Sequence, residues 1–403
     1  MFTIVTVKMF TFVKSIKDKM NHIKLHSEFK CSEVHGRYVN LQKIEPILNR
    51  LNDQNQLEIL GYSVQKRPVY KYKIGRGTTK ILMWSQMHGN ESTTTKGLLD
   101  FMNLLNSNEE FVQEILSNYT FCIIPMLNPD GSEVYTRENA NNVDLNRDFQ
   151  NLTQPESQLL MQCCKDYQPD ICFNLHDQRT IFGVGTTGKP ATLSFLAPSY
   201  NEEREFDAAR LKSVDVIMKM VDELEQYIPQ QIGRFDDGYN INCVGDTFQT
   251  LKIPTILVEA GHFPEDYERE ETRKFVFIAL LAAFKNNDST QSVKDNLIKY
   301  LNISQNIPNF YDIIYKNIKK IQHNSNIITN FAIQFKEELI NDNIEFVARI
   351  VKIGNLDGFF GHFVFDAQGM EYSDNELNIP KFDMKANFYL NKNVKIVNGF
   401  IKK

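Results

Sequence analysis

The sequence has 403 residues, long enough for one large domain and a smaller one. With 42% hydrophobic and 24% charged residues, its composition is that of an ordinary folded globular protein, without a low-complexity tract or an internal repeat. The net charge of −5 argues against a nucleic-acid-binding surface spread over the whole chain, so we expect no nucleic-acid partner.

The N-terminal residues and the cysteines bear on the compartment. No run of eighteen apolar residues is present, so we expect no membrane span. The N-terminal stretch is mildly apolar, but Lys8 and Lys14 interrupt it and no small-residue cleavage site follows, so we expect no signal peptide. Residues 1–30 are interpreted as an N-terminal extension, with Met20 as an alternative start. The cysteines form no CxxC pair, which favours a reducing compartment and a cytoplasmic location.

Apolar runs alternate with helical patterns between residues 41 and 286. Strands are expected at 57–64, 69–75, 80–86, 120–127, 170–176 and 254–260, and the last four are apolar enough to be buried on both faces. Helices are expected at 41–52, 92–106, 110–117, 155–167, 202–227 and 265–286. Strands and helices that alternate in this way predict an α/β sheet with helices on both faces.

The character of the sequence changes after residue 287. The polar stretch 286–291 is followed by a helical pattern at 292–321, around Pro308. Beyond it, apolar residues alternate as in the strands of an antiparallel sheet, at 331–335, 344–354 and 359–369. We therefore predict a large domain at residues 31–287 and a small C-terminal α+β region at residues 288–403, helical first and then rich in strands. His323 and His362 are interpreted there as surface or core residues.

Polar residues follow the buried strands, at the sheet edge where reactive groups of α/β proteins collect. His88 and Glu91 lie three residues apart where a strand gives way to a helix, and an imidazole with a carboxylate suits Zn²⁺. Taken alone, a His and a Glu at this spacing are far more often a helix-capping residue and a solvated acid of the first turn. His176 ends another buried strand and adds a second imidazole. Two imidazoles and one carboxylate leave a fourth position for water, as in a catalytic zinc site.

The segment 135–149 is rich in Asn and Asp and contains two arginines. Arg147 offers a planar fork that matches a carboxylate, and Asn146 adds an amide donor, so we interpret the two as an anion clamp. Arg137 would lie nearer the metal and stabilise an oxyanion. Asp144 could accept the free N–H of a zinc-bound imidazole. A hydrogen-bonded surface turn is the alternative interpretation of this segment.

Glu259 ends the apolar strand at 254–260, where an unpaired carboxylate is costly to bury. As a general base it would take a proton from a zinc-bound water. A buried structural salt bridge is the alternative. His262, three residues further on, could be its partner, a surrounding residue or unrelated to it.

Five short motifs in a fixed order, "HGNE", "NPDG", "VDLNR", "NLH" and "VEAG", resemble those of the zinc carboxypeptidase family of carboxypeptidase A-like metallopeptidases. The resemblance extends over residues 35–286. It implies a three-layer α/β/α sandwich on a mixed, mostly parallel sheet of about eight strands. It also implies one Zn²⁺ per chain, with His88, Glu91 and His176 as its ligands.

The resemblance also implies roles for the other candidates. Asn146 and Arg147 would hold a terminal carboxylate, and Arg137 would lie at the oxyanion. Asp144 would lie behind His88. Glu259 would act as base and later donate its proton to the leaving amine.

Two features depart from the family pattern. Val258 precedes the base, where the family has Thr or Phe, and Ala260, Gly261 and His262 follow it. The tyrosine that lies over the substrate terminus in the family has Tyr239 as its best candidate, although the spacing to the base is shorter here.

The function that we expect is that of a zinc metallocarboxypeptidase, a hydrolase that cleaves the C-terminal amide bond of peptides. The main alternative is a zinc-dependent deacylase of N-acyl amino acids, similar to aspartoacylase and succinylglutamate desuccinylase. A non-catalytic binding module is a further alternative. For both enzyme alternatives, the expected partner is a peptide or a small acyl amino acid with a free carboxylate. The sequence indicates neither the preferred side chain nor the oligomeric state.

Overall fold

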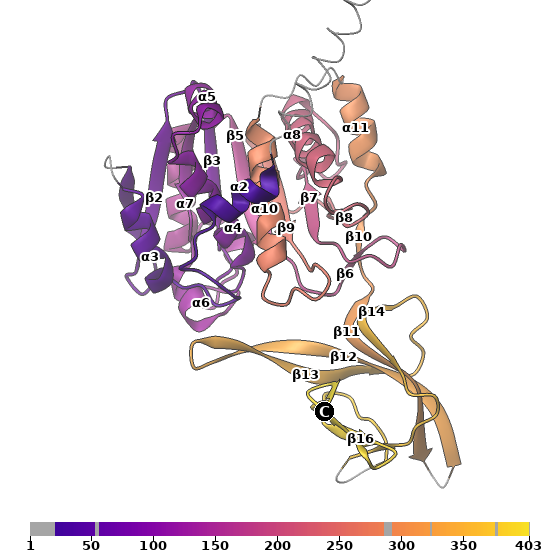
Figure 1. Cartoon of the computed structure of the whole chain (residues 1–403). Coiled ribbons are helices and arrows are strands. Elements are labelled where there is room, and N and C mark those ends of the chain that lie inside the picture. Colours follow the sequence, from indigo (N-terminus) through magenta and orange to yellow (C-terminus); the bar gives the residue numbers. More distant parts are fainter. Residues whose placement is uncertain (1–20, 53–55, 286–291, 323–324, 375–377, 403) are drawn as a thin grey trace, which may run out of the picture.

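The computed structural model describes residues 21–52, 56–285, 292–322, 325–374 and 378–402, which form a larger α/β unit and a smaller β unit (Figure 1). The predictions for residues 1–20, for the polar stretch 286–291 and for His323 lie outside the described residues. In the described part of the chain, none of the helices combines the length and the apolar character that a membrane span requires. The cytoplasmic location stays a prediction.

An eight-stranded sheet forms the centre of the larger unit, in the order β1-β2-β4-β3-β5-β9-β7-β8. Its strands are β1 (Leu57–Tyr62), β2 (Pro68–Gly75), β3 (Thr79–Ser85), β4 (Tyr119–Ile124), β5 (Ile171–Asp177), β7 (Leu193–Leu196), β8 (Ile232–Arg234) and β9 (Thr255–Ala260). The inner strands β4, β3, β5 and β9 are parallel to one another. β2 is antiparallel to β4, and β7 to β9. The predicted α/β fold on a mixed, mostly parallel sheet is therefore confirmed.

Helices cover both faces of this sheet, and β3 shows why the sequence requires them. Ile81 and Met83 belong to the core on one face, with α4 (Thr93–Leu105) and α10 (Glu270–Phe284). Leu82 and Trp84 belong to the core on the other face, with α7 (Pro155–Tyr167) and α9 (Val244–Thr250). Because successive side chains of a strand point to opposite faces, a strand between two helical layers must be apolar throughout. The helices are α2 (His22–Phe29), α3 (Leu41–Arg50), α4 (Thr93–Leu105), α5 (Glu110–Asn118), α6 (Pro129–Val134), α7 (Pro155–Tyr167), α8 (Ala208–Leu224), α9 (Val244–Thr250), α10 (Glu270–Phe284) and α11 (Val293–Asn302).

The elements of the larger unit that sequence analysis missed are short. They are α2, α6, α9, β6 (Phe182–Val184), β7 and β8, and none exceeds eight residues. Such elements hold too few residues to show a periodic pattern. In α6, the side chain of Asn128 accepts a hydrogen bond from the N–H of Gly131 at 2.8 Å, and Pro129 occupies the first turn. The "NPDG" motif is therefore a capped helix start.

The helical pattern predicted on both sides of Pro308 is wrong beyond α11. The chain continues there as β10 (Asn306–Pro308) and β11 (Phe310–Gln322), and β10 pairs with β6 of the larger unit. A proline lacks the N–H that a helix interior needs, and it holds the preceding residue in an extended conformation.

Helices α2 and α11 both pack on the larger unit. α2 contacts α4 and α10, and α11 contacts α8. Tyr300 of α11 is fully buried, and its hydroxyl accepts a hydrogen bond from the N–H of Ala197 at 3.0 Å. The domain boundaries at residues 30 and 287 stay predictions, but this packing favours including both helices in the larger unit.

The C-terminal unit consists of two four-stranded sheets, in the orders β13-β12-β11-β14 and β15-β16-β17-β18. The strands that follow β11 are β12 (Ser325–Ile340), β13 (Asn343–Ile353), β14 (Phe360–Asp366), β15 (Tyr372–Ser373), β16 (Phe388–Leu390), β17 (Val394–Val397) and β18 (Phe400–Ile401). Their shared core includes Phe331 of the first sheet and Phe388 of the second. β14 pairs in parallel with β11, which corrects the antiparallel expectation for this strand. The β12–β13 hairpin extends along the larger unit (Figure 1).

Candidate active site

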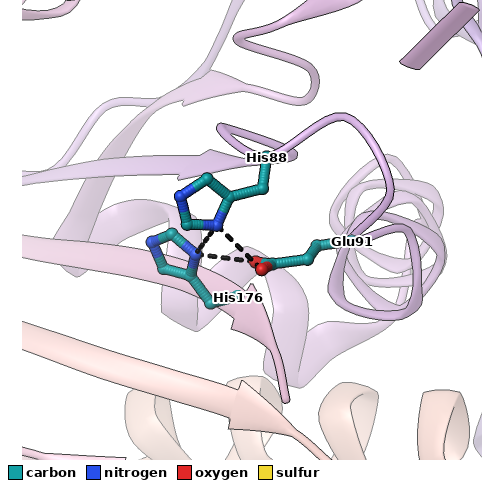
Figure 2. A group of neighbouring side chains, drawn as sticks. All are labelled: His88, Glu91 and His176. Carbon is teal, nitrogen blue, oxygen red and sulfur yellow. Dashed lines mark hydrogen bonds and ion pairs between the residues drawn. The ribbon is translucent and has the colours of Figure 1, made fainter. Parts of the chain in front are cut away.

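Three predicted site residues, His88, Glu91 and His176, converge beyond the carboxyl ends of β3 and β5 (Figure 2). The Nδ1 atom of His88 lies 2.8 Å from Oε1 of Glu91, and Nδ1 of His176 lies 2.8 Å from Oε2 of the same carboxylate. The two Nδ1 atoms are 3.1 Å apart. All three side chains are buried. The two imidazoles and the carboxylate thus present their donor atoms to one point.

These donor atoms fit a zinc ion. Ligands at about 2.0–2.1 Å from a tetrahedral zinc are separated by roughly 3.3 Å, close to the 2.8–3.1 Å found among the donor atoms here. Two ring nitrogens that face each other can share a hydrogen bond only if one of them carries a proton. A cation between them satisfies both nitrogens and the carboxylate at once. The chemistry of the donor set is that of a catalytic zinc site.

Close backbone contacts hold the turn that carries the first two of these residues. A Cβ atom at Gly89 would lie 2.0 Å from the carbonyl carbon of Gly131, so the "HGNE" and "NPDG" motifs pack backbone to backbone and glycine is required. On the neighbouring strand, the Asp177 carboxylate accepts hydrogen bonds from the first two N–H groups of α4, at 2.7 and 3.0 Å. This contact ties the end of β5 to the helix that follows Glu91.

Asp144 and Arg137 surround the His88 ring. Nε2 of His88 lies 3.1 Å from Oδ1 of Asp144, which would keep the proton on Nε2 and leave Nδ1 facing Glu91 and His176. The Nε of Arg137 donates to Oδ2 of Asp144 at 3.0 Å. Its Nη1 lies 3.1 Å from Nδ1 of His88 and donates to Oε1 of Glu91 at 3.2 Å. The guanidinium of Arg137 is therefore beside the three convergent side chains.

Burial and charge act in opposite directions on the pKa values of this cluster. Burial alone would raise the pKa of Glu91, but His88 and His176 lower it far below its usual range. The pKa of Asp144 is lowered in the same way against burial, by His88 and Arg137. Burial lowers the pKa of His176, as a metal-binding neutral imidazole requires. The two acids are thus held ionised.

The three convergent side chains line a cavity with a volume of about 770 Å³. Asn146 and Arg147, in the 3₁₀ turn η1 (Leu145–Arg147), line the same cavity. The side-chain oxygen of Asn146 accepts a hydrogen bond from the N–H of Val244 at 3.0 Å. Nη1 of Arg147 donates to the carbonyl of Asn146 at 2.7 Å and lies 3.2 Å from Sγ of Cys243. Among the described residues, the side chain of Arg147 contacts this carbonyl and this sulfur but forms no ion pair with a carboxylate. Its positive charge is therefore available to a ligand.

Glu259 lines the cavity from β9, where it is paired in register with His176 of β5. Burial raises its pKa well above the usual value, as do the charges of Glu91 and Asp177, against the opposing charge of Arg137. Within the described part of the chain, no side chain forms a hydrogen bond or an ion pair with this carboxylate. Among the described residues, Glu259 therefore has no partner for the buried structural salt bridge that was its alternative interpretation.

The structure does not bring Tyr239 into the cavity. Its hydroxyl lies 3.3 Å from Oγ1 of Thr250, at an exposed position, whereas its neighbours Gly238 and Asn240 line the cavity. The backbone around Tyr239 is thus near the site, but its side chain lies against Thr250, and its role over a substrate stays a prediction.

His262 is also outside the cavity lining. It is buried against His362 of β14, with 4.1 Å between the ring centroids, and neither of its ring nitrogens has a hydrogen-bond partner among the described residues. The ring lies between the two units and does not contact Glu259. Nε2 of His362 donates a hydrogen bond to the carbonyl of Thr180 at 2.8 Å, so His362 is a half-buried residue of the interface between the two units.

The cavity also contains residues that sequence analysis did not single out. They include Arg37, Tyr135 at the end of α6, Asp246 of α9, and residues 335–337 of β12. Burial raises the pKa of Asp246 to about 7. These residues come from four separate segments, and no spacing pattern links them along the sequence.

Part of the chain is similar to a known protein family. Residues 41–222 match the model of the family described as zinc carboxypeptidase. The matched segment contains the three convergent side chains together with Arg137, Asn146 and Arg147, whereas Glu259 lies beyond it.

Curated relatives match part of the chain. Carboxypeptidase SOL1 of Arabidopsis thaliana is 34% identical over 126 residues, which cover 28% of this chain and 23% of SOL1. Carboxypeptidase D of Rattus norvegicus is 27% identical over 264 residues, which cover 55% of this chain and 19% of the relative. The chain thus spans less than a quarter of the length of either relative.

A solved structure shares the fold. The crystal structure of a Shewanella denitrificans OS-217 protein assigned as a carboxypeptidase A superposes with a TM-score of 0.50 at 17% identity, over 60% of this chain and 67% of that chain.

Proposed function

Because residues 41–222 match the zinc carboxypeptidase family, we propose that the chain is a member of this family and a zinc-dependent metallocarboxypeptidase that hydrolyses the C-terminal amide bond of peptides. The observation that carries the proposal is the convergence of His88, Glu91 and His176 in a cavity that also contains the unpaired carboxylate of Glu259. A lone base beside a zinc-binding donor set is the arrangement that hydrolysis requires.

Each residue of the site has its own role in the proposed reaction. His88, Glu91 and His176 would hold the ion, which supplies a Lewis acid that polarises a carbonyl and makes a nearby water more acidic. Glu259 takes a proton from the attacking water and later donates it to the leaving amine. Arg137 donates N–H groups to the oxygen on which negative charge develops.

Substrate selection would depend on the other end of the site. Arg147 offers a guanidinium without a carboxylate partner, and the neighbouring Asn146 adds an amide. A planar guanidinium binds a terminal carboxylate through two parallel hydrogen bonds. Holding that group places the last amide bond of the peptide over the reacting side chains.

A deacylase of N-acyl amino acids would use the same clamp, because a single acylated residue also ends in a carboxylate. The two functions differ only in what precedes the scissile bond. Matched substrates therefore separate them: short peptides, and single acylated amino acids with the same terminal residue.

The test measures metal content and the release of free amino acids from both substrate sets, with and without a chelator. We expect one zinc per chain, release from peptides with a free carboxylate, and little release from peptides whose C-terminus is amidated. Release only from the acylated amino acids would establish the deacylase. A protein that holds zinc but hydrolyses neither set would be the binding module, and the proposal would be wrong.

A further inference from the structure

Arg37 is a buried cation in the cavity that the proposed function does not use. Only 5% of its surface is exposed, and it lines the same cavity as the metal-site residues. Its Nη2 lies 3.1 Å from Oε1 of Glu337, whereas its Nε and Nη1 have no hydrogen-bond partner among the described residues. An arginine cannot satisfy its donors by losing a proton, so these N–H groups call for an acceptor.

The C-terminal unit holds this arginine in place. Glu337 lies on β12, and its second carboxylate oxygen accepts a hydrogen bond from the hydroxyl of Tyr135, two residues before Arg137. Earlier on the same strand, Nε2 of Gln334 donates to Oγ1 of Thr180 at 2.8 Å. β12 is thus fixed to the larger unit at Gln334 and at Glu337, and residues 335–337 line the cavity.

We propose that Arg37 binds an oxygen atom on the acyl side of the substrate, and that β12 thereby completes the substrate-binding site. The acceptor is a peptide carbonyl or a carboxylate, which share the chemistry that a guanidinium recognises. Glu337 is a positioning residue in this scheme, since it touches Arg37 and not the substrate.

The side of the substrate follows from the proposed function, on which this inference rests. Asn146 and Arg147 would hold the terminal carboxylate, and the metal-site side chains with Glu259 would surround the scissile bond. Arg37 and β12 line the same cavity from other elements, so they are left for the part of the substrate that precedes that bond. The C-terminal unit would therefore be part of the active site, not an appended module.

Three substrates with one terminal residue test the inference. An acetylated amino acid has no acceptor beyond the scissile carbonyl, an acetylated dipeptide with glycine before the terminal residue adds a carbonyl, and a succinylated amino acid adds a carboxylate. We expect Arg37→Gln to lower kcat/KM about 10- to 100-fold for the substrate whose added oxygen binds Arg37, which is either the acetylated dipeptide or the succinylated amino acid. This is the loss expected for a hydrogen bond from a charged donor. Hydrolysis of the acetylated amino acid should not change.

Two further variants keep the test decisive if Arg37→Gln does not fold. Glu337→Gln should show the same substrate-selective loss, smaller and mainly in KM. Glu338→Gln removes the same charge from the next residue of β12, where the carboxylate pairs with Lys336 instead of Arg37, and should leave all three rates unchanged. Equal losses on all three substrates, or no loss on any, would overturn the assignment of Arg37.

Failure of the proposed function would look different. In that case the wild-type protein would hydrolyse none of the three substrates. Calorimetric titration of the Glu259→Gln protein with the same compounds would still show whether an acyl-side acceptor strengthens binding and whether Arg37→Gln removes that gain.

Discussion

His176 and Glu259 occupy directly paired positions on the neighbouring parallel strands β5 and β9. Side chains in register on adjacent parallel strands project from the same side of the sheet. The pairing therefore brings a residue of the metal cluster and an unpaired carboxylate to one edge, although they are far apart along the chain. The "NLH" and "VEAG" motifs, at the ends of these two strands, therefore contribute residues to one site.

The substitution Glu259→Gln tests the role of this carboxylate. It keeps the shape of the side chain and removes its ability to take a proton, so we expect kcat to fall about 10²- to 10⁴-fold. Zinc content should stay at one ion per chain, because Glu259 does not contact the other donors. The matched control is Glu271→Gln, an exposed acid paired with Lys274 outside the cavity, which should retain full activity. Turnover that survives Glu259→Gln would refute the assignment of the base.

Loss of one imidazole should abolish metal binding. His176→Ala leaves one imidazole and one carboxylate, too few protein ligands for a stable zinc site. Elemental analysis should find zinc in the wild type and almost none in the variant. Added zinc should raise the Tm of the wild type only, since a ligand stabilises the folded state that binds it. His35→Ala, at an exposed histidine, is the control and should bind zinc normally. Full zinc content in His176→Ala would place the metal elsewhere.

The fold was predictable where burial leaves a continuous apolar run. β3, β4, β5 and β9 lie between two helical layers, so each contains a run of buried apolar side chains that makes the strand evident from sequence. β7 and β8 have four and three residues, and their pairing at the sheet edge depends on tertiary contacts that no local pattern records. The strand β11 was mistaken for a helix because short apolar runs fit both periods.

The site was predictable to the extent that its residues belong to motifs at strand ends. His88, Glu91 and His176 do so, and they converge. Arg37 and Glu337 could not be paired from sequence, since their contact exists only once the C-terminal unit docks on the larger one. The role of Tyr239 stays a prediction, because a position inferred from spacing alone does not fix where a side chain points, and its hydroxyl lies beside Thr250.

Replacement of Arg147 should weaken recognition of the terminal carboxylate. We expect Arg147→Met to lower kcat/KM about 10- to 100-fold on peptides with a free C-terminus, because a charge-assisted hydrogen-bonded contact is lost. The slow reaction with C-terminally amidated peptides should be unaffected. Arg179→Met removes an exposed arginine from the lining of the same cavity and serves as the control. If both variants lose the same activity, the clamp is not specific to Arg147.

A buried ion pair should dominate the stability of the N-terminal part of the larger unit. Arg273 donates from Nη2 and Nε to the two oxygens of Asp100, at 2.6 Å each, and both side chains are fully buried. Asp100→Ala leaves the guanidinium without this partner, so we expect the free energy of unfolding to fall by about 3–5 kcal/mol. Denaturant titration measures this change. Asp222→Ala removes an exposed acid 3.7 Å from Lys299 and should change it by less than about 1 kcal/mol.

Asp246 should make stability fall as pH rises. Burial raises its pKa to about 7 in the folded protein, whereas an unfolded Asp titrates near pH 3.9. Between these values the folded protein keeps a proton that the unfolded chain has released. The contribution of Asp246 to the free energy of unfolding therefore decreases with rising pH across this window and is constant above it.

Asp246→Asn replaces the titrating acid with a neutral group of the same shape and should remove this part of the pH dependence. Denaturant titrations at pH 5 and pH 8 measure the difference. We expect the wild type to lose more stability than the variant between the two conditions, by about 1–4 kcal/mol for a shift of this size. Asp236→Asn, at an exposed acid on the rim of the same cavity, controls for surface charge and should follow the wild type. An unchanged pH dependence in Asp246→Asn would mean that this carboxyl is already ionised at pH 5, because the cavity then stabilises its charge.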